Sequence, residues 1–266
     1  SYNIDILAKT DVGINSISNT ITATTTTIDS LYQNSVFYSK FNNTQGKLLD
    51  IRNGYKGTLN GGVQQGATGL ISGMTSYEFD GLNGSYIEIS NNNDVIFTDG
   101  TNDIPFSIEM LISFNSFNPG SKDGSWLICK RDELNNKFEF QINYFNSLSF
   151  DLKSVSGGGS IRASFDSANL QINQTYHLVC TYNGSKDTNG LSIYLDGINV
   201  VNNQQAADAI YSGMDNTGSN VVLGTNSWAK NRNFNGKMQI LNIVKGHAYT
   251  PTEVANLYDN GNFNLF

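Results

Sequence analysis

From about Ser35 onwards, short apolar segments alternate with turns rich in Asn, Gly, Asp and Ser. In several segments every second residue is apolar, which is typical of a strand with one face on a core and the other in water. Strands are expected at 85–89, 106–114, 137–143, 175–182, 191–195 and 220–224. The dipeptide Asp196-Gly197 between two apolar segments predicts a two-residue hairpin turn. The pattern indicates an antiparallel β-sandwich or barrel, with Phe79, Ile108 and Leu195 in its core.

One helix is predicted near the C-terminus. Thr250 is a suitable N-cap, Pro251 is suited to the first helical position, and Glu253 lies three residues after the cap. Asn260-Gly261 is the expected stop signal. The rest of the domain is expected to be β-structure.

Composition excludes several classes of protein. A net charge of −7 argues against binding to nucleic acid, because such proteins neutralise phosphates with clustered Lys and Arg. No apolar run approaches the roughly 18 residues that a membrane helix needs, and the first 30 residues do not resemble a signal peptide. No nucleic acid or membrane partner is therefore expected. Cys129 and Cys180 are both in strand-like segments, where two buried free thiols are favoured over a cross-strand disulfide.

The first 33 residues differ from the rest of the chain, so we expect an N-terminal arm at 1–33 and one domain at 34–266. The arm is rich in Thr and has apolar residues at alternating spacings of three and four: Ile14, Ile17, Ile21, Ile28 and Leu31, with Thr24 completing the series. Such a seam, with Ile at both core positions, favours a trimeric coiled-coil stalk. If the arm is helical, a homotrimer follows. An extended or disordered linker is the alternative, because Thr has weak helix propensity.

Five segments together resemble a known family. They are SVFYSKFNNTQGKLLDIRNGYKGTLNGGV at 35–63, YEFDGLNGSYIEIS at 77–90, FSIEMLISF at 106–114, YHLVCTYNGSKDTNGLSIYLDGINV at 176–200 and FNGKMQILNIVKGHAYTPTEVANLY at 234–258. Their order resembles laminin G-like domains of the concanavalin A-like lectin/glucanase superfamily over about residues 35–262. The resemblance implies an all-β fold, a jelly-roll sandwich of two antiparallel sheets. With it we expect one short C-terminal helix and an N-terminal extended or helical arm.

The same resemblance allows a test for catalysis. Glycoside hydrolysis needs two carboxylates around the scissile bond, and the glucanases that resemble this fold place them on one strand as Glu-x-Asp-x(-x)-Glu. This triad does not occur in the sequence. A non-enzymatic protein is therefore expected, with a carbohydrate-active enzyme as a lesser alternative.

Two loops are candidates for ligand binding. Trp228 is in a polar segment, where its aromatic ring suits a sugar, and Asn226, Asn231 and Arg232 would accompany it. Alternatively, and with equal weight, Trp228 folds back and covers the edge of the sandwich without binding a ligand. The second candidate is the charged cluster of Lys130, Arg131 and Asp132 with Asn135 and Asn136, in a loop that the resemblance places beside the concave face. An ordinary solvated hairpin is the alternative there, and Trp126 is expected in the core.

Many laminin G-like domains hold a calcium ion at a sheet edge, so the resemblance also makes Ca²⁺ a possible cofactor. Asp50 and Asp80 are at positions where relatives often have acidic residues. However, the last family segment commonly has Asp-Glu after an apolar residue, whereas this chain has Met238-Gln239-Ile240.

These observations predict a recognition module that binds a glycan or a cell-surface receptor. A phage fibre tip or virion surface is the expected setting, because a trimeric stalk and a terminal receptor-binding domain are combined there. A secreted or bacterial cell-surface protein is the alternative setting. The rival function is a structural or decoration protein that contacts other virion proteins and no sugar.

Overall fold

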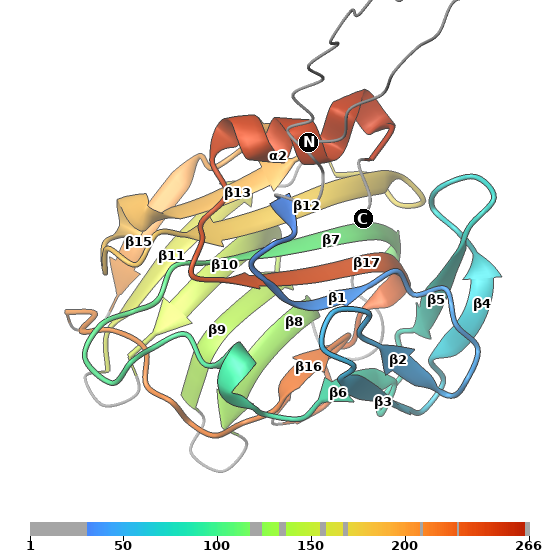
Figure 1. Ribbon diagram of the computed structural model, residues 1–266, viewed down its shortest axis with the longest axis horizontal. Helices are drawn as coiled ribbons and strands as arrows, with labels where there is room; N and C mark the ends of the chain where they lie inside the picture. The colour runs from blue at the N-terminus through green and yellow to red at the C-terminus, as the bar shows by residue number, and fades with distance from the viewer. Residues whose placement is uncertain are drawn as a thin grey trace, which may run out of the picture.

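The computed structural model describes residues 31–117, 124–132, 137–154, 158–166, 170–207, 210–227 and 229–263. Their strands form two antiparallel sheets, one of eight strands and one of nine (Figure 1). The two-sheet antiparallel jelly-roll sandwich predicted from the sequence is thus confirmed.

The eight-stranded sheet has β7 and β17 at its centre. Its order is β14 (Ile198–Asn199), β13 (Leu191–Leu195), β12 (Thr175–Tyr182), β7 (Phe106–Ser116), β17 (Asn235–Lys245), β5 (Thr75–Asp80) and β4 (Gln64–Thr68), and β1 (Ser35–Ser39) also pairs with β17. Asp196 and Gly197 both have positive φ, 50° and 81°, between β13 and β14. This is the backbone of the predicted hairpin turn.

The nine-stranded sheet carries the site described below. Its order is β15 (Asn203–Ala207), β11 (Ser160–Asp166), β10 (Ser147–Lys153), β9 (Lys137–Tyr144), β8 (Ser125–Asp132), β16 (Val221–Leu223), β6 (Tyr86–Ile89), β3 (Lys56–Asn60) and β2 (Lys47–Leu49). Short 3₁₀ turns occur at η1 (Asn93–Val95), η2 (Thr188–Gly190) and η3 (Asp259–Gly261). The strands expected from the sequence are found, with shifts at their ends.

The main core lies between the two sheets. Ile108, Met110 and Ile112 of β7 point into it from one sheet, and Phe140 and Ile142 of β9 from the other. The three expected core residues belong to it: Phe79 and Ile108 are fully buried, and Leu195 is 8% exposed.

A second, smaller core covers the opposite face of the eight-stranded sheet. The helix α2 (Pro251–Tyr258) contributes Val254 and Leu257, which pack with Leu111 of β7 and Val179 of β12. The predicted helix start is confirmed, because Thr250 and Glu253 form a reciprocal capping box. The helix ends just before the expected Asn260-Gly261 stop: Asp259 adopts the left-handed conformation, and η3 carries the chain through Gly261.

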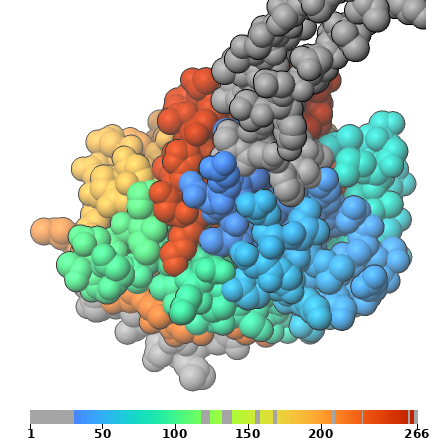
Figure 2. All heavy atoms as spheres, in the orientation of Figure 1, coloured from blue at the N-terminus to red at the C-terminus, as the bar shows by residue number. Residues whose placement is uncertain are grey.

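The last residues of the predicted arm pack against the domain. Tyr32 is fully buried in the second core, and Leu31 lies against it. β1 then pairs with β17, so segments from near both ends of the chain lie side by side (Figure 2). The other seam residues lie outside the described residues, and the stalk and homotrimer stay predictions.

The two cysteines are free and buried, and they lie on different sheets, Cys129 on β8 and Cys180 on β12. The favoured prediction of two free thiols is confirmed. No helix in the described ranges is long and apolar enough to cross a membrane.

Candidate functional site

The outer face of the nine-stranded sheet, which points away from the main core, is polar. On β9, Phe140 and Ile142 enter the core, so the alternating residues Gln141 and Asn143 point outwards. The same alternation sends Ser149 and Asp151 of β10 and Arg162 of β11 to the outer face. All of these except Arg162 are buried. Polar side chains buried on an outer face indicate a hollow rather than a flat, solvated surface.

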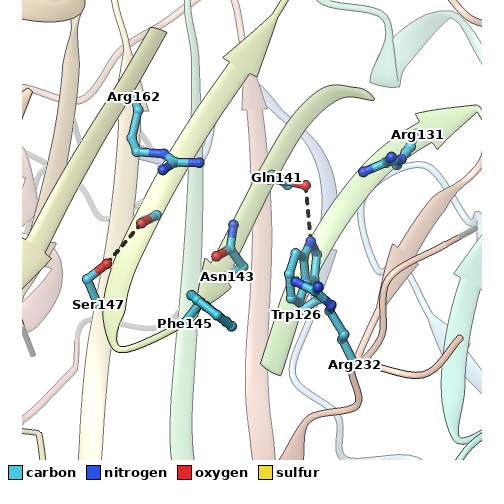
Figure 3. Close-up of a pocket in the computed structure, with 9 residues that line it drawn as sticks. Trp126, Arg131, Gln141, Asn143, Phe145, Ser147, Arg162 and Arg232 are labelled. Carbon is cyan, nitrogen blue, oxygen red and sulfur yellow. Dashed lines mark hydrogen bonds between the residues drawn. The ribbon is translucent and has the colours of Figure 1, made fainter. Parts of the chain in front are cut away.

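A pocket of about 290 Å³ occupies this face (Figure 3). We call it the outer-face pocket, and it is lined by Trp126, Arg131, Gln141, Asn143, Phe145, Ser147, Ser149, Arg162 and Arg232. Arg131 and Arg162 enter from opposite sides, with Gln141 and Asn143 between them. The lining residues come from β8, β9, β10 and β11, from the turn between β9 and β10, and from the segment before β17.

Asp151 organises the floor of the pocket. Its carboxylate accepts hydrogen bonds from Gln141 Nε2 and Asn143 Nδ2, both at 3.0 Å, and forms an ion pair with Arg162. Gln141 Oε1 in turn accepts a hydrogen bond from the Trp126 indole at 3.1 Å. These contacts fix the orientation of both amides before any ligand arrives, which lowers the entropic cost of binding.

Two aromatic side chains lie in the pocket. Trp126 is only 4% exposed, and the guanidinium of Arg232 lies 4.8 Å from its ring centre. Phe145 is 44% exposed, in the turn between β9 and β10 where Asn146 has a φ of 57°. Arg232 therefore covers Trp126, and Phe145 is the ring that the pocket offers to a ligand.

Arg131 and Arg232 place positive charge close together. Burial lowers the pKa of Arg131 to about 10; Cys129 opposes this shift, and the charge of Arg232 adds to it. The pKa remains well above 7, so Arg131 stays charged at neutral pH. The pocket thus holds a partly desolvated cation beside a second cation.

The structure unites parts of the two candidate loops predicted from sequence, because Arg131 and Arg232 line the same pocket. Asn226 is fully buried, and its Oδ1 accepts hydrogen bonds from the backbone N–H groups of Asn231 and Arg232, both at 2.9 Å. Asn226 Nδ2 also donates to Asn231 Oδ1 at 3.2 Å. Asn226 and Asn231 therefore shape the loop and hold the backbone of Arg232. Trp228 lies outside the described residues.

The segment containing Arg131 and Asp132 is not a loop, and this corrects the prediction. β8 extends to Asp132, so these residues are strand residues, and of Asp132 only the backbone is described. Asn135 and Asn136 lie outside the described residues. The cross-strand pairing with β9 extends to Asp132 opposite Lys137, which explains why the strand continues through this charged stretch.

Sequence reasoning missed most of the pocket. Phe145, Arg162 and the outward amides Gln141 and Asn143 were not among the candidates. Trp126 is buried as expected, but on the outer face with Cys129 and Val222 rather than in the main core. The sequence pattern that could have identified this face is the alternation on β9, where the amides Gln141 and Asn143 alternate with the core residues Phe140 and Ile142.

The two predicted calcium ligands hold turns. The Asp50 carboxylate accepts hydrogen bonds from the backbone N–H groups of Tyr38 (2.8 Å), Arg52 (3.0 Å), Asn53 (2.9 Å) and Tyr55 (3.3 Å). Asp80 is exposed and accepts from Leu82 N at 2.9 Å. Within the described ranges, no group of three or more His, Cys, Asp or Glu side chains is placed to hold a metal ion. A carboxylate surrounded by N–H donors is a poor cation ligand, so Asp50 is better explained as a turn residue.

Comparisons with solved structures show the same fold. The binding domain of Paraclostridial Mosquitocidal Protein 1 has a TM-score of 0.64 at 20% identity, over 86% of this chain and 52% of that chain. The Botulinum neurotoxin serotype D binding domain has a TM-score of 0.63 at 13% identity, over 87% and 52%. A Trypanosoma rangeli sialidase solved with sialic acid has a TM-score of 0.59 at 10% identity, over 85% and 33%. This chain thus spans about half the length of the two toxin domains.

Comparison with curated protein sequences gives no match. A family model of laminin G-like domains, described as concanavalin A-like lectin/glucanases superfamily, matches residues 80–255. The matched segment includes the strands that carry the outer-face pocket and most of the main core. The chain therefore belongs to the concanavalin A-like lectin/glucanases superfamily.

Proposed function

We propose that this chain is a recognition domain that binds a carbohydrate in the outer-face pocket without converting it. The observation that carries the proposal is the exposed ring of Phe145 beside the polar groups of Asn143, Ser147 and Ser149. A sugar has an apolar C–H face that packs on an aromatic ring and hydroxyl groups that need donors and acceptors. A concave site with a few fixed polar groups satisfies both requirements.

Binding is favoured over hydrolysis by the chemistry of the lining. Glycoside hydrolysis uses a pair of carboxyl groups, and none of the nine lining side chains is acidic. The nearby Asp151 is occupied by Arg162, Gln141 and Asn143. Both oxygens of this carboxylate are therefore already engaged by other side chains of the sheet, and it does not line the pocket.

The structural neighbours support recognition at the level of the fold. Two of them are toxin binding domains, and a third was solved with sialic acid. Fold similarity alone does not transfer a ligand. The phage fibre or virion setting rests on the sequence of the arm, and a structural protein without a sugar ligand is the rival function.

Replacing Phe145 with Ala is expected to weaken glycan binding by about tenfold or more, because loss of an aromatic contact worth roughly 1.4 kcal/mol changes the dissociation constant tenfold. A glycan array selects the ligand, and isothermal titration calorimetry measures its affinity for both proteins. Ile198→Ala is the control, since Ile198 is 69% exposed on β14 of the other sheet. Unchanged affinity for the Phe145 variant, or no glycan bound on the array, would contradict the proposal.

A further inference from the structure

A second hollow, of about 420 Å³, lies where β3 begins and β6 ends, and we call it the β3–β6 pocket. Its lining includes Tyr55, Lys56, Ile89, Ser90, Asn91 and Asn92. In the nine-stranded sheet, β16 separates β6 from β8, the nearest strand that lines the outer-face pocket (Figure 1). The two pockets share no lining residue. They are therefore separate sites on one sheet.

The lining of the β3–β6 pocket combines apolar surface with polar groups. Ile89 is buried in the main core, and the half-buried Tyr55 packs against that core. Ser90 is exposed, and Asn91 and Asn92 are half-buried. An aromatic ring suits the C–H face of a sugar, whereas a hydroxyl and two amides supply donors and acceptors for its hydroxyl groups. The same combination of groups occurs in the outer-face pocket.

The ring of Tyr55 is held at both ends. Its backbone N–H donates to the Asp50 carboxylate at 3.3 Å, in the turn that Asp50 closes. Its hydroxyl donates to Asp94 Oδ2 at 2.8 Å, in η1 on the β6 side of the pocket. The ring is thus fixed across the pocket before a ligand arrives.

The β6 side of the pocket is also held by hydrogen bonds. Asn92 is the N-cap of η1, and its Oδ1 accepts from Asp94 N at 2.8 Å. The backbone N–H of Asn91 donates to Asn220 Oδ1 at 2.8 Å. Groups that are already in place lower the entropic cost of binding.

One acceptor of the lining lacks a donor. Asn91 Oδ1 is buried, and it has no hydrogen-bond partner among the residues that the structure describes. A buried acceptor without a donor is costly. The terminal torsion of an Asn side chain is soft, so a small rotation brings this oxygen towards the pocket. A hydroxyl group of a ligand would then supply the missing donor.

The charges around the β3–β6 pocket favour a neutral ligand. Lys56 is exposed and is the charged side chain of the lining. Two carboxylates adjoin the pocket: Asp94 binds the Tyr55 hydroxyl, and Glu88 accepts from Asn220 Nδ2 at 3.1 Å, beside Asn91. One cation and two carboxylates give no excess of positive charge that would select an anion.

We propose that the β3–β6 pocket is a second carbohydrate site, which binds one neutral sugar residue with its apolar face on Tyr55 and its hydroxyl groups on Ser90, Asn91 and Asn92. This site goes beyond the proposed function, which assigns binding to the outer-face pocket alone. The family match begins at residue 80, so Tyr55 lies outside it and the site does not follow from family membership. Two sites on one chain would hold a multivalent glycan more tightly than either site alone.

The test is NMR spectroscopy on the full chain carrying Phe145→Ala, which removes the aromatic contact of the outer-face pocket. The probes are galactose, glucose, mannose and N-acetylglucosamine, each titrated to about 10 mM, where a site with a dissociation constant of about 1 mM is mostly occupied. At least one sugar is expected to shift the amide signals of residues 90–92 in a saturable way. No such shift with any of the four sugars would overturn the second site.

Tyr55→Leu is the informative variant, because it removes the aromatic ring and keeps apolar contact with the core. We expect it to weaken binding of the responding sugar by about tenfold or more. Tyr55→Phe is the matched control, since it keeps the ring, and it should lose less affinity than the Leu variant does. Thermal unfolding verifies that both variants are folded. A Leu variant that binds as tightly as Tyr55 does would contradict the proposed site.

These outcomes are distinguishable from those of the proposed function. A glycan whose binding is lost with Phe145→Ala, together with no response at residues 90–92, would overturn the second site and leave the outer-face pocket as the carbohydrate site. A sugar that shifts residues 90–92 in the Phe145→Ala variant supports the second site even when the outer-face pocket binds no glycan.

Discussion

Replacing Lys130 with Met is expected to lower the free energy of unfolding by about 3–5 kcal/mol, because it leaves a buried carboxylate without its partner. Lys130 Nζ lies 3.0 Å from Glu139 Oε2, and both side chains are fully buried. Nζ also donates to the carbonyl oxygen of Val95 at 2.9 Å. Burial lowers the pKa of Lys130, and the charge of Glu139 opposes this shift. Urea denaturation monitored by circular dichroism measures the effect.

Two comparisons isolate the ion pair from the substitution itself. Lys56→Met makes the same change at an exposed lysine of β3 and is expected to alter stability by no more than about 0.5 kcal/mol. The double variant Lys130→Met with Glu139→Gln removes both charges and should recover much of the loss, since Gln retains an acceptor for Thr217. A single Lys130 variant as stable as the parent would show that the pair is not needed.

The second large effect is expected at Asp103. Replacing it with Ala should cost about 3 kcal/mol or more, because three buried donors lose their acceptor at roughly 1–3 kcal/mol each. Asp103 Oδ2 accepts from the hydroxyls of Tyr182 (2.7 Å) and Tyr211 (2.8 Å), and Oδ1 accepts from Met214 N (2.7 Å). These bonds tie the segment before β16 to the sandwich. Urea denaturation again measures the loss.

Asp103→Asn is the matched control for this prediction. Asn keeps one acceptor oxygen in the same shape, so it should lose less stability than Ala does. Equal losses for Asn and Ala would mean that the charge, rather than the set of hydrogen bonds, is what stabilises this region.

The fold could be predicted because its signals are local. Alternating apolar residues marked β7, β9 and β12, and the turn at Asp196-Gly197 marked the hairpin that follows β13. The capping box at Thr250 and Glu253 marked the start of α2. Each of these patterns acts over a few residues, so the sequence alone reveals it.

The candidate site was only partly predictable, because it depends on which strands become neighbours. Arg131 and Arg232 were chosen in separate segments, and the pairing of β8 with β9 and the loop held by Asn226 bring them together. Arg162 enters the site through the pairing of β10 with β11. No local pattern reports this strand order.

Two buried polar residues have roles that differ from those expected from the sequence. Lys130 was read with its charged neighbours as part of a surface segment, yet it is fully buried against Glu139. Asp50 was read as a metal ligand, yet it accepts four backbone N–H groups in a turn. The role of Lys130 is determined by the carboxylate of Glu139 on the neighbouring strand. The role of Asp50 is determined by backbone N–H groups of the turn that it closes.

The central claim, that ligands bind in the outer-face pocket, is tested most directly by the fluorescence of Trp126. The chain has two tryptophans, so Trp228→Phe leaves Trp126, on the floor of the pocket, as the only one. We expect a saturable change in its emission on titration with the glycan selected by the array, with the dissociation constant that calorimetry gives for the same variant. Binding measured by calorimetry with no change in Trp126 emission would contradict the claim.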